Sequence, residues 1–330
     1  MIEMNKANIK NIGVFTSGGD SPGMNAAIRA VVRTGLYYDL KVTGIYRGYD
    51  GMISGDFHLM ERKSVANIIQ RGGTILKTAR SEEFRTAEGR KKAYEQLKKH
   101  NVDAIVAIGG DGTFTGANIF YDEYKVPVIG LPGTIDNDLI GTDFTIGYDT
   151  AINTVIDAVD KIRDTAESHD RLFIVEVMGR DSGLIALRSG IGTGAEAILI
   201  PETKTDIKAL LCRLETSRKD KSSKIIIVAE GDDAGGAFEI AKVVKEKFPG
   251  TDTRVSILGH IQRGGPPSCM DRVLASRLGV AAVESLMEGR NREMIGIVNG
   301  KIHFTPFGNA IKHNPEVNPE LLKIVEILSL

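Results

Sequence analysis

A hydroxyl and two acids lie close together in the segment 130–138, which reads Gly-Leu-Pro-Gly-Thr-Ile-Asp-Asn-Asp. Thr134, Asp136 and Asp138 follow the apolar run from Pro127 to Leu131, which predicts a buried parallel strand. In open α/β sheets, ligands bind at the carboxyl ends of strands. Two neighbouring carboxylates suit phosphoryl transfer, because one can accept a substrate proton while another helps to hold a metal ion. Taken alone, the segment is also typical of a polar turn that bonds its own backbone.

A glycine-rich turn, Ser17 to Asn25, follows the first apolar run and leads into a predicted helix. Its glycines let the backbone approach a phosphate closely, and a helix N-terminus presents N–H groups to it. Met24 and Asn25 stand where a P-loop carries Lys and Ser or Thr, so this is not a Walker A motif. The turn indicates a phosphate site of another kind or a tight strand-to-helix connection.

A second glycine-rich turn, Gly109 to Thr113, follows another apolar run. Asp111, held between glycines, is a candidate ligand for Mg²⁺, a hard cation that prefers oxygen. Gly110, Gly112 and Gly116 miss the spacing of the dinucleotide fingerprint by one residue. The turn therefore disfavours a Rossmann dehydrogenase.

Four arginines lie at or just beyond the ends of predicted strands: Arg171, Arg180, Arg254 and Arg263. Guanidinium groups hold phosphate through paired hydrogen bonds and stay charged in a desolvated cleft. His260 and Gln262 share a turn with the last of them. We expect the four arginines to converge on an anionic ligand.

The elements that must position these residues alternate along the chain. Strands are predicted at 11–16, 41–46, 104–108, 127–131, 172–178, 197–200, 224–229 and 253–258, and helices at about 25–38, 90–100, 114–123, 148–167, 205–217, 237–247 and 271–288. This alternation predicts an α/β fold of two doubly wound, mainly parallel, Rossmann-like sheets with the active site in the cleft between them. A TIM barrel would also alternate but would not explain the glycine-rich turns. We place one domain at 1–146 plus 261–311 and the other at 147–260 plus 312–330.

Composition narrows the class of protein. The chain has 330 residues, with 42 basic against 43 acidic ones, so no global positive field favours nucleic acid. Cys212 and Cys269 have no metal or redox spacing, which fits a reduced, cytoplasmic compartment. The N-terminus lacks the features of a signal peptide, and no apolar run approaches the ~20 residues that span a bilayer. We expect neither nucleic acid nor a membrane as a partner.

Together, five motifs make the chain resemble a bacterial-type, ATP-dependent 6-phosphofructokinase from about Ile12 to beyond Gly279. They are the segments 17–26, 109–113, 132–138, 176–180 and 258–265. The resemblance implies a glycolytic enzyme that uses ATP and Mg²⁺ to phosphorylate the 1-hydroxyl of fructose 6-phosphate. It also implies that the first domain binds ATP and Mg²⁺, whereas the second binds the sugar phosphate.

The resemblance assigns roles residue by residue. Asp136 matches the base, Arg180 matches the residue that stabilises the moving phosphoryl group with Thr134 nearby, and Asp111 matches the Mg²⁺ ligand, direct or through water. The residues matched to ATP binding are Gly19, Arg80, Ser81, Gly110, Asp111, Gly112 and Thr113. Those matched to substrate binding are Thr134, Ile135, Asp136, Arg171, Met178, Gly179, Arg180, Glu230, Arg254, His260, Ile261, Gln262 and Arg263.

The resemblance further implies a homotetramer whose active sites are shared, with Arg171 and Arg254 reaching the substrate of a neighbouring subunit. An allosteric site for ADP or phosphoenolpyruvate matches Arg29, Arg33, Arg62, Arg163, Gly194, Glu196, Lys219 and Lys221. Asn67 replaces an acid of that site and Ser222-Ser223 replaces a Lys-His pair, so the dominant effector stays open. Asp181-Ser182 and a short insertion at 231–236 also depart from common members.

Three rival functions remain. A pyrophosphate-dependent phosphofructokinase typically carries Asp and Lys where this chain has Gly112 and Gly133, so the glycines favour ATP. NAD kinases and lipid kinases share Gly-Gly-Asp-Gly-Thr but would explain neither the acidic loop nor the turn 260–265. A catalytically dead nucleotide sensor would have lost Asp136 or Arg180, and both are present.

Overall fold

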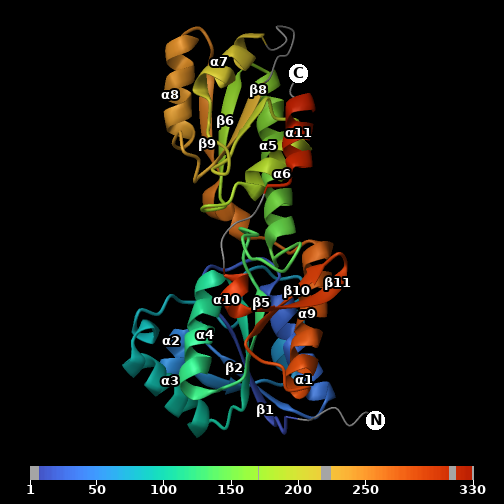
Figure 1. The fold of residues 1–330 in the computed structure, drawn as a ribbon. Helices are drawn as coiled ribbons and strands as arrows, with labels where there is room; N and C mark the ends of the chain where they lie inside the picture. Colours follow the sequence, from blue (N-terminus) through green and yellow to red (C-terminus); the bar gives the residue numbers. More distant parts are fainter. Residues whose placement is uncertain (1–6, 170, 217–223, 312–316, 329–330) are drawn as a thin grey trace. The chain divides into compact units, whose positions relative to one another are not determined.

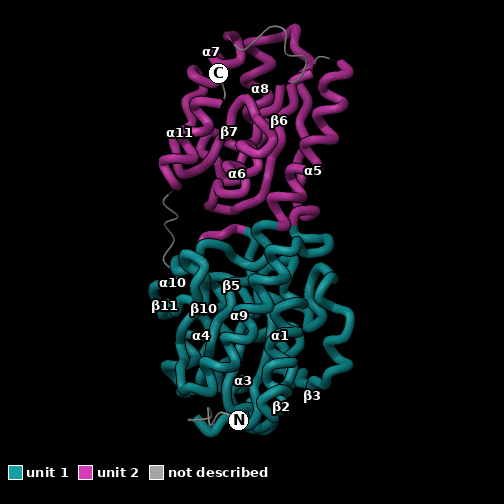
Figure 2. Tube along the Cα trace, turned by 90° about the vertical axis from the view of Figure 1, so that its right-hand side faces the viewer, with its two compact units in different colours: residues 1–135, 139–149, 263–314 teal, residues 136–138, 150–262, 315–330 magenta. Residues whose placement is uncertain are grey.

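The computed structural model describes residues 7–169, 171–216, 224–311 and 317–328, and the chain forms two compact units (Figures 1 and 2). Unit 1 comprises Met1–Ile135, Leu139–Asp149 and Arg263–Asn314. Unit 2 comprises Asp136–Asp138, Thr150–Gln262 and Pro315–Leu330. Each unit is therefore assembled from segments that are distant in the sequence.

Unit 1 is built on a seven-stranded sheet with the order β11-β10-β5-β4-β1-β2-β3. Its strands are β1 (Asn11–Thr16), β2 (Lys41–Ile45), β3 (Phe57–Leu59), β4 (Ala104–Gly109), β5 (Val128–Pro132), β10 (Glu293–Val298) and β11 (Lys301–Pro306). The neighbours from β10 to β2 pair in parallel, whereas β3 and β11 are antiparallel edge strands. All residues of β1, β4 and β5 are buried, as expected for parallel strands covered on both faces.

Helices cover both faces of this sheet: α1 (Met24–Tyr37), α2 (Gly48–Ser54), α3 (Ala87–Lys99), α4 (Asp111–Tyr124), α9 (Cys269–Met287) and α10 (Phe307–Ala310), with short 3-10 helices η1 (Arg62–Val65) and η2 (Glu83–Arg85). Val14 of β1 joins the core cluster formed with α1 and α9, whereas the next residue, Phe15, joins the cluster formed with α3 and α4. Because successive strand residues point to opposite faces, α1 and α4 lie on opposite sides of the sheet.

That placement defines the switch point of the sheet. The chain leaves β1 through α1 on one face and leaves β4 through α4 on the other, and β1 and β4 are neighbours. In open α/β sheets, ligands bind where adjacent strands send their outgoing connections to opposite faces. The two glycine-rich turns follow these two strands and therefore meet at the ligand-binding edge.

Unit 2 is built on a four-stranded parallel sheet with the order β7-β8-β6-β9. Its elements are β6 (Leu172–Val177), β7 (Ala197–Leu199), β8 (Lys224–Ala229), β9 (Thr253–Ile257), α5 (Tyr148–Glu167), α6 (Leu184–Thr193), α7 (Ile207–Thr216), α8 (Ala237–Lys247), α11 (Pro319–Leu328) and the 3-10 helix η3 (Gly259–Arg263). The residues of α5 from Thr150 onward belong to unit 2.

The second sheet has its own switch point. Leu210 of α7 and Ile240 of α8 share one core cluster with alternate residues of β6, β7 and β8. Helix α6 packs on the other face, where a Cβ on its Gly190 would clash with Ile198. The chain thus leaves the adjacent strands β6 and β8 on opposite faces (Figure 1). Their carboxyl ends are the expected ligand-binding edge of unit 2.

The sequence-based prediction of the elements is largely confirmed. All eight predicted strands are present, and β1, β8, α5 and α8 have the predicted bounds. The two open sheets exclude the TIM barrel. The prediction missed α2, α6, α10, α11, β3 and the hairpin β10–β11, whose turn is Asn299-Gly300 with positive φ at both residues. None of the helices in the described part of the chain is long and apolar enough to cross a membrane.

Candidate active site

The turn after β1 is shaped by glycines that adopt left-handed backbone. Gly18 has φ 84° and Gly23, which precedes α1, has φ 109°, a region that residues with a side chain rarely adopt. Thr78 donates a hydrogen bond of 2.6 Å to the backbone oxygen of Gly18, which brings the segment before Arg80 and Ser81 to this turn. Within the described residues, no side chain caps the N-terminus of α1. The accessible part of the turn runs from Gly18 to Asp20, because residues 21–27 are buried.

The turn after β4 uses its glycines in two different ways. A Cβ on Gly109 would clash with Thr113 Oγ1 and lie 2.6 Å from the backbone oxygen of Ser17, so this glycine lets the two turns touch. The backbone N–H of Ser17 donates to Ile108 O at 3.0 Å and fixes the same approach. At Gly112, no described atom lies within 4 Å of an added Cβ. The first turn of α4 thus faces open space.

Packing beneath α4 fixes the rest of this turn. The Tyr49 hydroxyl donates to the backbone oxygen of Thr113 at 2.6 Å, and burial raises the pKa of Tyr49. Gly110 lies next to Thr134, whose Cβ would be 3.8 Å from a Cβ on that glycine. Thr145 in turn donates to the backbone oxygen of Thr134 at 2.7 Å. The structure therefore brings the β4 turn and the start of the acidic loop together in unit 1.

Arg263 lies against the first glycine-rich turn. Its Nη1 donates to the backbone oxygen of Asp20 at 3.2 Å, and a Cβ on Gly19 would lie 2.6 Å from the same nitrogen. Gly19 therefore makes room for a guanidinium group. This places one predicted substrate residue beside a predicted ATP residue within unit 1.

Asp111 is the first residue of α4, beside the open space at Gly112. Among the described residues, no group of three or more His, Cys, Asp or Glu side chains forms a site that could hold a metal ion. Mg²⁺ in nucleotide enzymes is usually bound by one or two carboxylates plus phosphate oxygens and water. A single aspartate next to two glycine-rich turns fits that ligand set.

In unit 2, the turn from Met178 to Gly183 leads from β6 to α6 and carries Arg180. Arg180 has φ 57°, and Gly179 before it has φ 147°. A non-glycine residue in left-handed backbone persists only where its surroundings hold it, and such residues gather at functional sites. The conformation of Arg180 therefore marks this turn as a candidate site.

Two side chains hold the first half of this turn. The Glu230 carboxylate accepts hydrogen bonds from the N–H groups of Gly179 at 3.3 Å and Arg180 at 2.7 Å. Gln262 accepts one from the N–H of Met178 at 3.2 Å and donates one to Gly259 O at 2.9 Å, which fixes η3 with His260 and Ile261. The structure brings these predicted substrate residues together at the carboxyl edge of unit 2.

The acidic loop spans the border of the two units. Thr134 and Ile135 belong to unit 1, whereas the contacts of Asp136–Asp138 place them in unit 2, which also holds Arg180. The side chain of Asp136 is buried, with 8% of the residue exposed. Burial of a carboxyl group in a ligand-binding loop is typical of a catalytic acid or base.

Within one chain, Arg171 and Arg254 do not converge with Arg180. Arg171 precedes β6 and Arg254 is the second residue of β9, so both lie at the amino edge of the sheet. Arg180 lies at the opposite edge, a strand length or roughly 20 Å away. Arg171 and Arg254 instead share Asp252, at 2.7 and 2.8 Å, and these bonds hold the pKa of Asp252 below its usual value.

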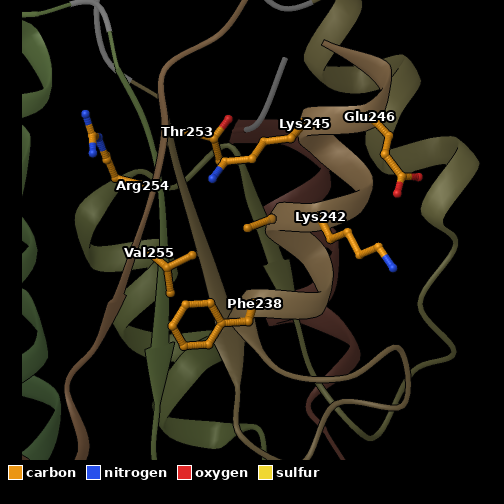
Figure 3. A pocket seen from close by; sticks show the side chains of 8 residues that line it. Phe238, Lys242, Lys245, Glu246, Thr253, Arg254 and Val255 are labelled. Carbon is orange, nitrogen blue, oxygen red and sulfur yellow. The ribbon is translucent and has the colours of Figure 1, made fainter. Parts of the chain in front are cut away.

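An open groove of ≈ 630 Å³ lies beside this pair, between α8 and the edge strand β9 (Figure 3). It is lined by Phe238, Ala241, Lys242, Lys245, Glu246, Thr253, Arg254 and Val255. Three cations against one acid give the groove a positive character. It lies at the amino half of β9 and is therefore separate from the turn that carries Arg180.

The residues matched to the effector site fall into two groups. Arg29 and Arg33 lie on α1 near Arg62 of η1 in unit 1, and burial and Arg33 lower the pKa of Arg29. In unit 2, Arg163 donates to the backbone oxygen of Thr193, next to Gly194 and close to the buried Glu196. Lys219, Lys221 and Ser222-Ser223 lie outside the described residues.

Sequence reasoning missed several residues that shape these turns. A Cβ on Gly231 would clash with the backbone oxygen of Arg180, and Glu202 accepts a hydrogen bond from Gly183 N–H at 2.8 Å. Asp252 joins the two arginines described above. Glu202 and Gly231 follow predicted strands, which is the only signal that could have pointed to them.

Comparison with known proteins agrees with this geometry. The family model for phosphofructokinase matches residues 11–286. An ATP-dependent 6-phosphofructokinase from Cytophaga hutchinsonii is 58% identical over 322 residues, covering 97% of this chain and 98% of the relative. ATP-dependent 6-phosphofructokinase 1 from Thermus thermophilus is 54% identical over 323 residues, covering 98% of this chain and all of the relative.

Solved structures show the same fold. Phosphofructokinase from Saccharomyces cerevisiae matches with a TM-score of 0.87 at 38% identity, covering 97% of this chain and 47% of that longer chain. A pyrophosphate-dependent phosphofructokinase from Marinobacter aquaeolei matches with a TM-score of 0.82 at 22% identity, which is a likeness of fold alone. By its sequence and its fold, the chain belongs to the phosphofructokinase family.

Proposed function

We propose that the protein is an ATP-dependent 6-phosphofructokinase. It transfers the γ-phosphoryl group of ATP to the 1-hydroxyl of D-fructose 6-phosphate and releases fructose 1,6-bisphosphate and ADP, a step of glycolysis. One observation carries the proposal: two glycine-rich turns touch each other at the β1/β4 switch point, and Asp111 lies in the second turn beside the open space at Gly112. The near full-length identity to relatives that are named for this activity supports it.

Unit 1 binds the nucleotide. Gly19, Arg80, Ser81 and the turn 110–113 surround the triphosphate, and the N–H groups at the start of α4 face its negative charge. Asp111 would hold Mg²⁺, which would neutralise charge on the nucleotide phosphates. The open space at Gly112 leaves room for the phosphates.

Unit 2 binds the sugar phosphate and positions the cation that stabilises the transferring phosphoryl group. The residues proposed to contact it are Met178, Gly179, Glu230, His260, Ile261, Gln262 and, from unit 1, Thr134, Ile135 and Arg263. The guanidinium group of Arg180 stabilises the negative charge that develops on the moving phosphoryl group, and Thr134 adds a hydroxyl donor. The fixed backbone of the turn sets the point from which the Arg180 side chain extends.

Asp136 is the proposed general base. Its buried carboxylate accepts the proton of the 1-hydroxyl as the oxygen attacks the γ-phosphorus. The O–P bond to the sugar forms while the bond to the ADP oxygen breaks, and the electron pair leaves with ADP. Thr134 lies two residues before Asp136, so the base and the hydroxyl donor come from the same loop.

The structure supports ATP over pyrophosphate as the donor. Gly112 leaves open space where an acid would approach the nucleotide. A Cβ on Gly133 would lie 3.0 Å from both Ile108 and Met24, so this site accommodates a larger residue only if its neighbours move. The family's pyrophosphate-dependent members typically carry Asp and Lys at these two positions. Their solved structures resemble this chain in fold alone.

Arg171 and Arg254 serve a neighbouring subunit in this proposal. They lie at the amino edge of unit 2, a strand length from Arg180, and so cannot complete the site at the opposite edge of their own sheet. A homotetramer with shared active sites would use them, and such interfaces couple one site to another. We further propose a cytoplasmic enzyme regulated by ADP or phosphoenolpyruvate through the residues around Arg29 and Arg163.

The test is the formation of fructose 1,6-bisphosphate and of ADP by purified protein with Mg²⁺. ATP with fructose 6-phosphate should give sustained turnover. Replacing ATP by pyrophosphate, or fructose 6-phosphate by NAD or diacylglycerol, should abolish it. Turnover with pyrophosphate but not ATP would support the pyrophosphate-dependent rival. ATP binding without ADP release that depends on fructose 6-phosphate would support a nucleotide sensor.

A further inference from the structure

The turn that carries Arg180 is held at its far end by a residue outside the motifs. Gly183, the residue that precedes α6, donates its N–H to Glu202 Oε1 at 2.8 Å. Glu202 comes from the segment after β7. The first turn of α6, which is described in full, contains no acid of its own. A carboxylate at this position favours the helix N-terminus, because the helix dipole is positive there.

Glu202 completes a pattern that involves every strand of the sheet. The segments after β8, β9 and β7 each send one side-chain oxygen to an N–H group of the turn after β6. Glu230 binds the middle of the turn, Gln262 binds its start and Glu202 binds its end. The N–H of the left-handed residue Arg180 is itself one anchor point, and the anchored residues Met178 and Gly183 lie on either side of it. The turn is therefore fixed from both sides of the residue that it presents.

The fit at the last anchor is tight. A Cβ on Gly183 would clash with Ile200 and lie 2.5 Å from Glu202 Oε2, so the glycine is needed for the carboxylate to approach. Glu202 Oε2 is buried and has no hydrogen-bond partner among the described residues. An unsatisfied buried oxygen is unfavourable for folding, and its retention calls for another explanation. The hydrogen bond from Gly183 N–H to the other carboxylate oxygen, Glu202 Oε1, supplies that explanation.

We propose that Glu202 is a positioning residue that holds Arg180 in its left-handed conformation. The inference rests on the proposed function, because it takes Arg180 as the group that stabilises the transferring phosphoryl group. Release of Gly183 would let the turn relax toward ordinary backbone angles and move the guanidinium group. Because the nucleotide turns lie in unit 1, turnover should fall while ATP binding persists.

The test is a double-mutant cycle in the full-length protein. Glu202→Ala should lower kcat about 10-fold, since small misplacements of a reacting group are costly, with the KM for ATP unchanged. In an Arg180→Ala background the same change should lower kcat less than about 2-fold further, because the group that it positions is gone. Glu202→Gln, which keeps the acceptor oxygen, should stay within about 3-fold of wild type. Thr203→Ala on the same segment is the matched control and should match wild type.

An activity-independent readout accompanies the cycle. Glu202→Ala should increase hydrogen–deuterium exchange of the peptide that covers 178–184 and leave the peptides of β1 and β4 unchanged. If Glu202→Ala does not fold, Glu202→Asp, which withdraws the carboxylate by one methylene, takes its place. Equal losses of kcat in both Arg180 backgrounds, or unchanged exchange in the turn, would overturn the inference. If wild-type protein forms no fructose 1,6-bisphosphate, the proposed function fails, and the exchange measurement still decides whether Glu202 holds the turn.

Discussion

The turns at the carboxyl edges of the two sheets are shaped in opposite ways. In unit 1, glycines remove side chains, so that two turns touch and the start of α4 borders open space at Gly112. In unit 2, side-chain oxygens are added, so that one turn is held in a conformation which its arginine would not adopt by preference. The first edge suits a ligand that must approach the backbone. The second suits a cation that must be aimed.

A third region, the amino edge of unit 2, differs from both. Arg171 and Arg254 there are held by Asp252 and not by backbone, and Arg254 borders an open groove. Charges held by an exposed carboxylate can be reoriented cheaply, because exposed ion pairs are weak. This edge is therefore suited to meeting another molecule, whereas the carboxyl edges are built to keep one geometry.

The largest expected effect is the loss of kcat when the proposed general base is removed. Asp136→Ala should lower kcat by roughly 10²–10⁴-fold, the range for loss of a general base. The thermal midpoint should change little. Steady-state rates with ATP and fructose 6-phosphate measure it, with Asp160→Ala on the exposed face of α5 as the control. A variant within a few-fold of wild type would remove Asp136 from the role of base.

The two uses of glycine in unit 1 can be told apart. Gly112→Asp should fold as well as wild type, because no described atom is near its Cβ, yet raise the KM for ATP about 100-fold, since a carboxylate there repels phosphate. Gly109→Ala should instead destabilise folding by about 1–3 kcal/mol through its clash with Thr113. Denaturation and initial rates on both variants check the pair. The reverse pattern would show that the comparison of the two glycines is mistaken.

The amino edge of unit 2 gives a smaller effect. Arg254→Ala should raise the KM for fructose 6-phosphate about 10-fold or more, as expected for one lost charge-assisted hydrogen bond, with kcat for saturated enzyme changed less. The titration of initial rate against fructose 6-phosphate measures it, with Lys242→Ala in the same groove as a control for overall charge. An unchanged affinity would show that this edge does not complete a neighbouring site.

The smallest effect concerns the loop after β8. Asp232 accepts hydrogen bonds from Thr205 Oγ1 and Ala234 N–H, and burial raises the pKa of its carboxyl group. Because the pKa is higher in the folded state, ionisation destabilises the fold as pH rises above the ordinary value of 3.8. The free energy of unfolding of Asp232→Asn relative to wild type should therefore increase as the pH rises from 3.5 to 7. Urea denaturation at both pH values tests this, and a difference that does not vary with pH would refute it.

Local patterns in the sequence predict most of the scaffold. Apolar runs bounded by glycine and proline mark β1 and β8, and the amphipathic period marks α5 and α8 with their observed bounds. The hairpin β10–β11 was missed although its Asn-Gly turn is a recognised hairpin signal. Helix α6 is rich in glycine and apolar residues, so its period is weak.

The site is only partly predictable because some of its determinants are non-local. The amino-edge position of Arg171 could have been read from the direction of the strand that follows it. The left-handed backbone of Arg180 could not, since no glycine or asparagine marks it and its supports come from residues up to 84 positions away. Glu202 gives no local signal, because its partner is a backbone N–H on another segment.

The central claim is that one chain brings ATP and a phosphorylated ketohexose together for transfer to the sugar's 1-hydroxyl. It is tested most directly by ³¹P NMR of purified protein with Mg²⁺, ATP and fructose 6-phosphate. The account predicts that a new sugar 1-phosphate resonance appears in step with ADP, without inorganic phosphate. Release of inorganic phosphate with ADP, or a product that forms only from pyrophosphate, would contradict it.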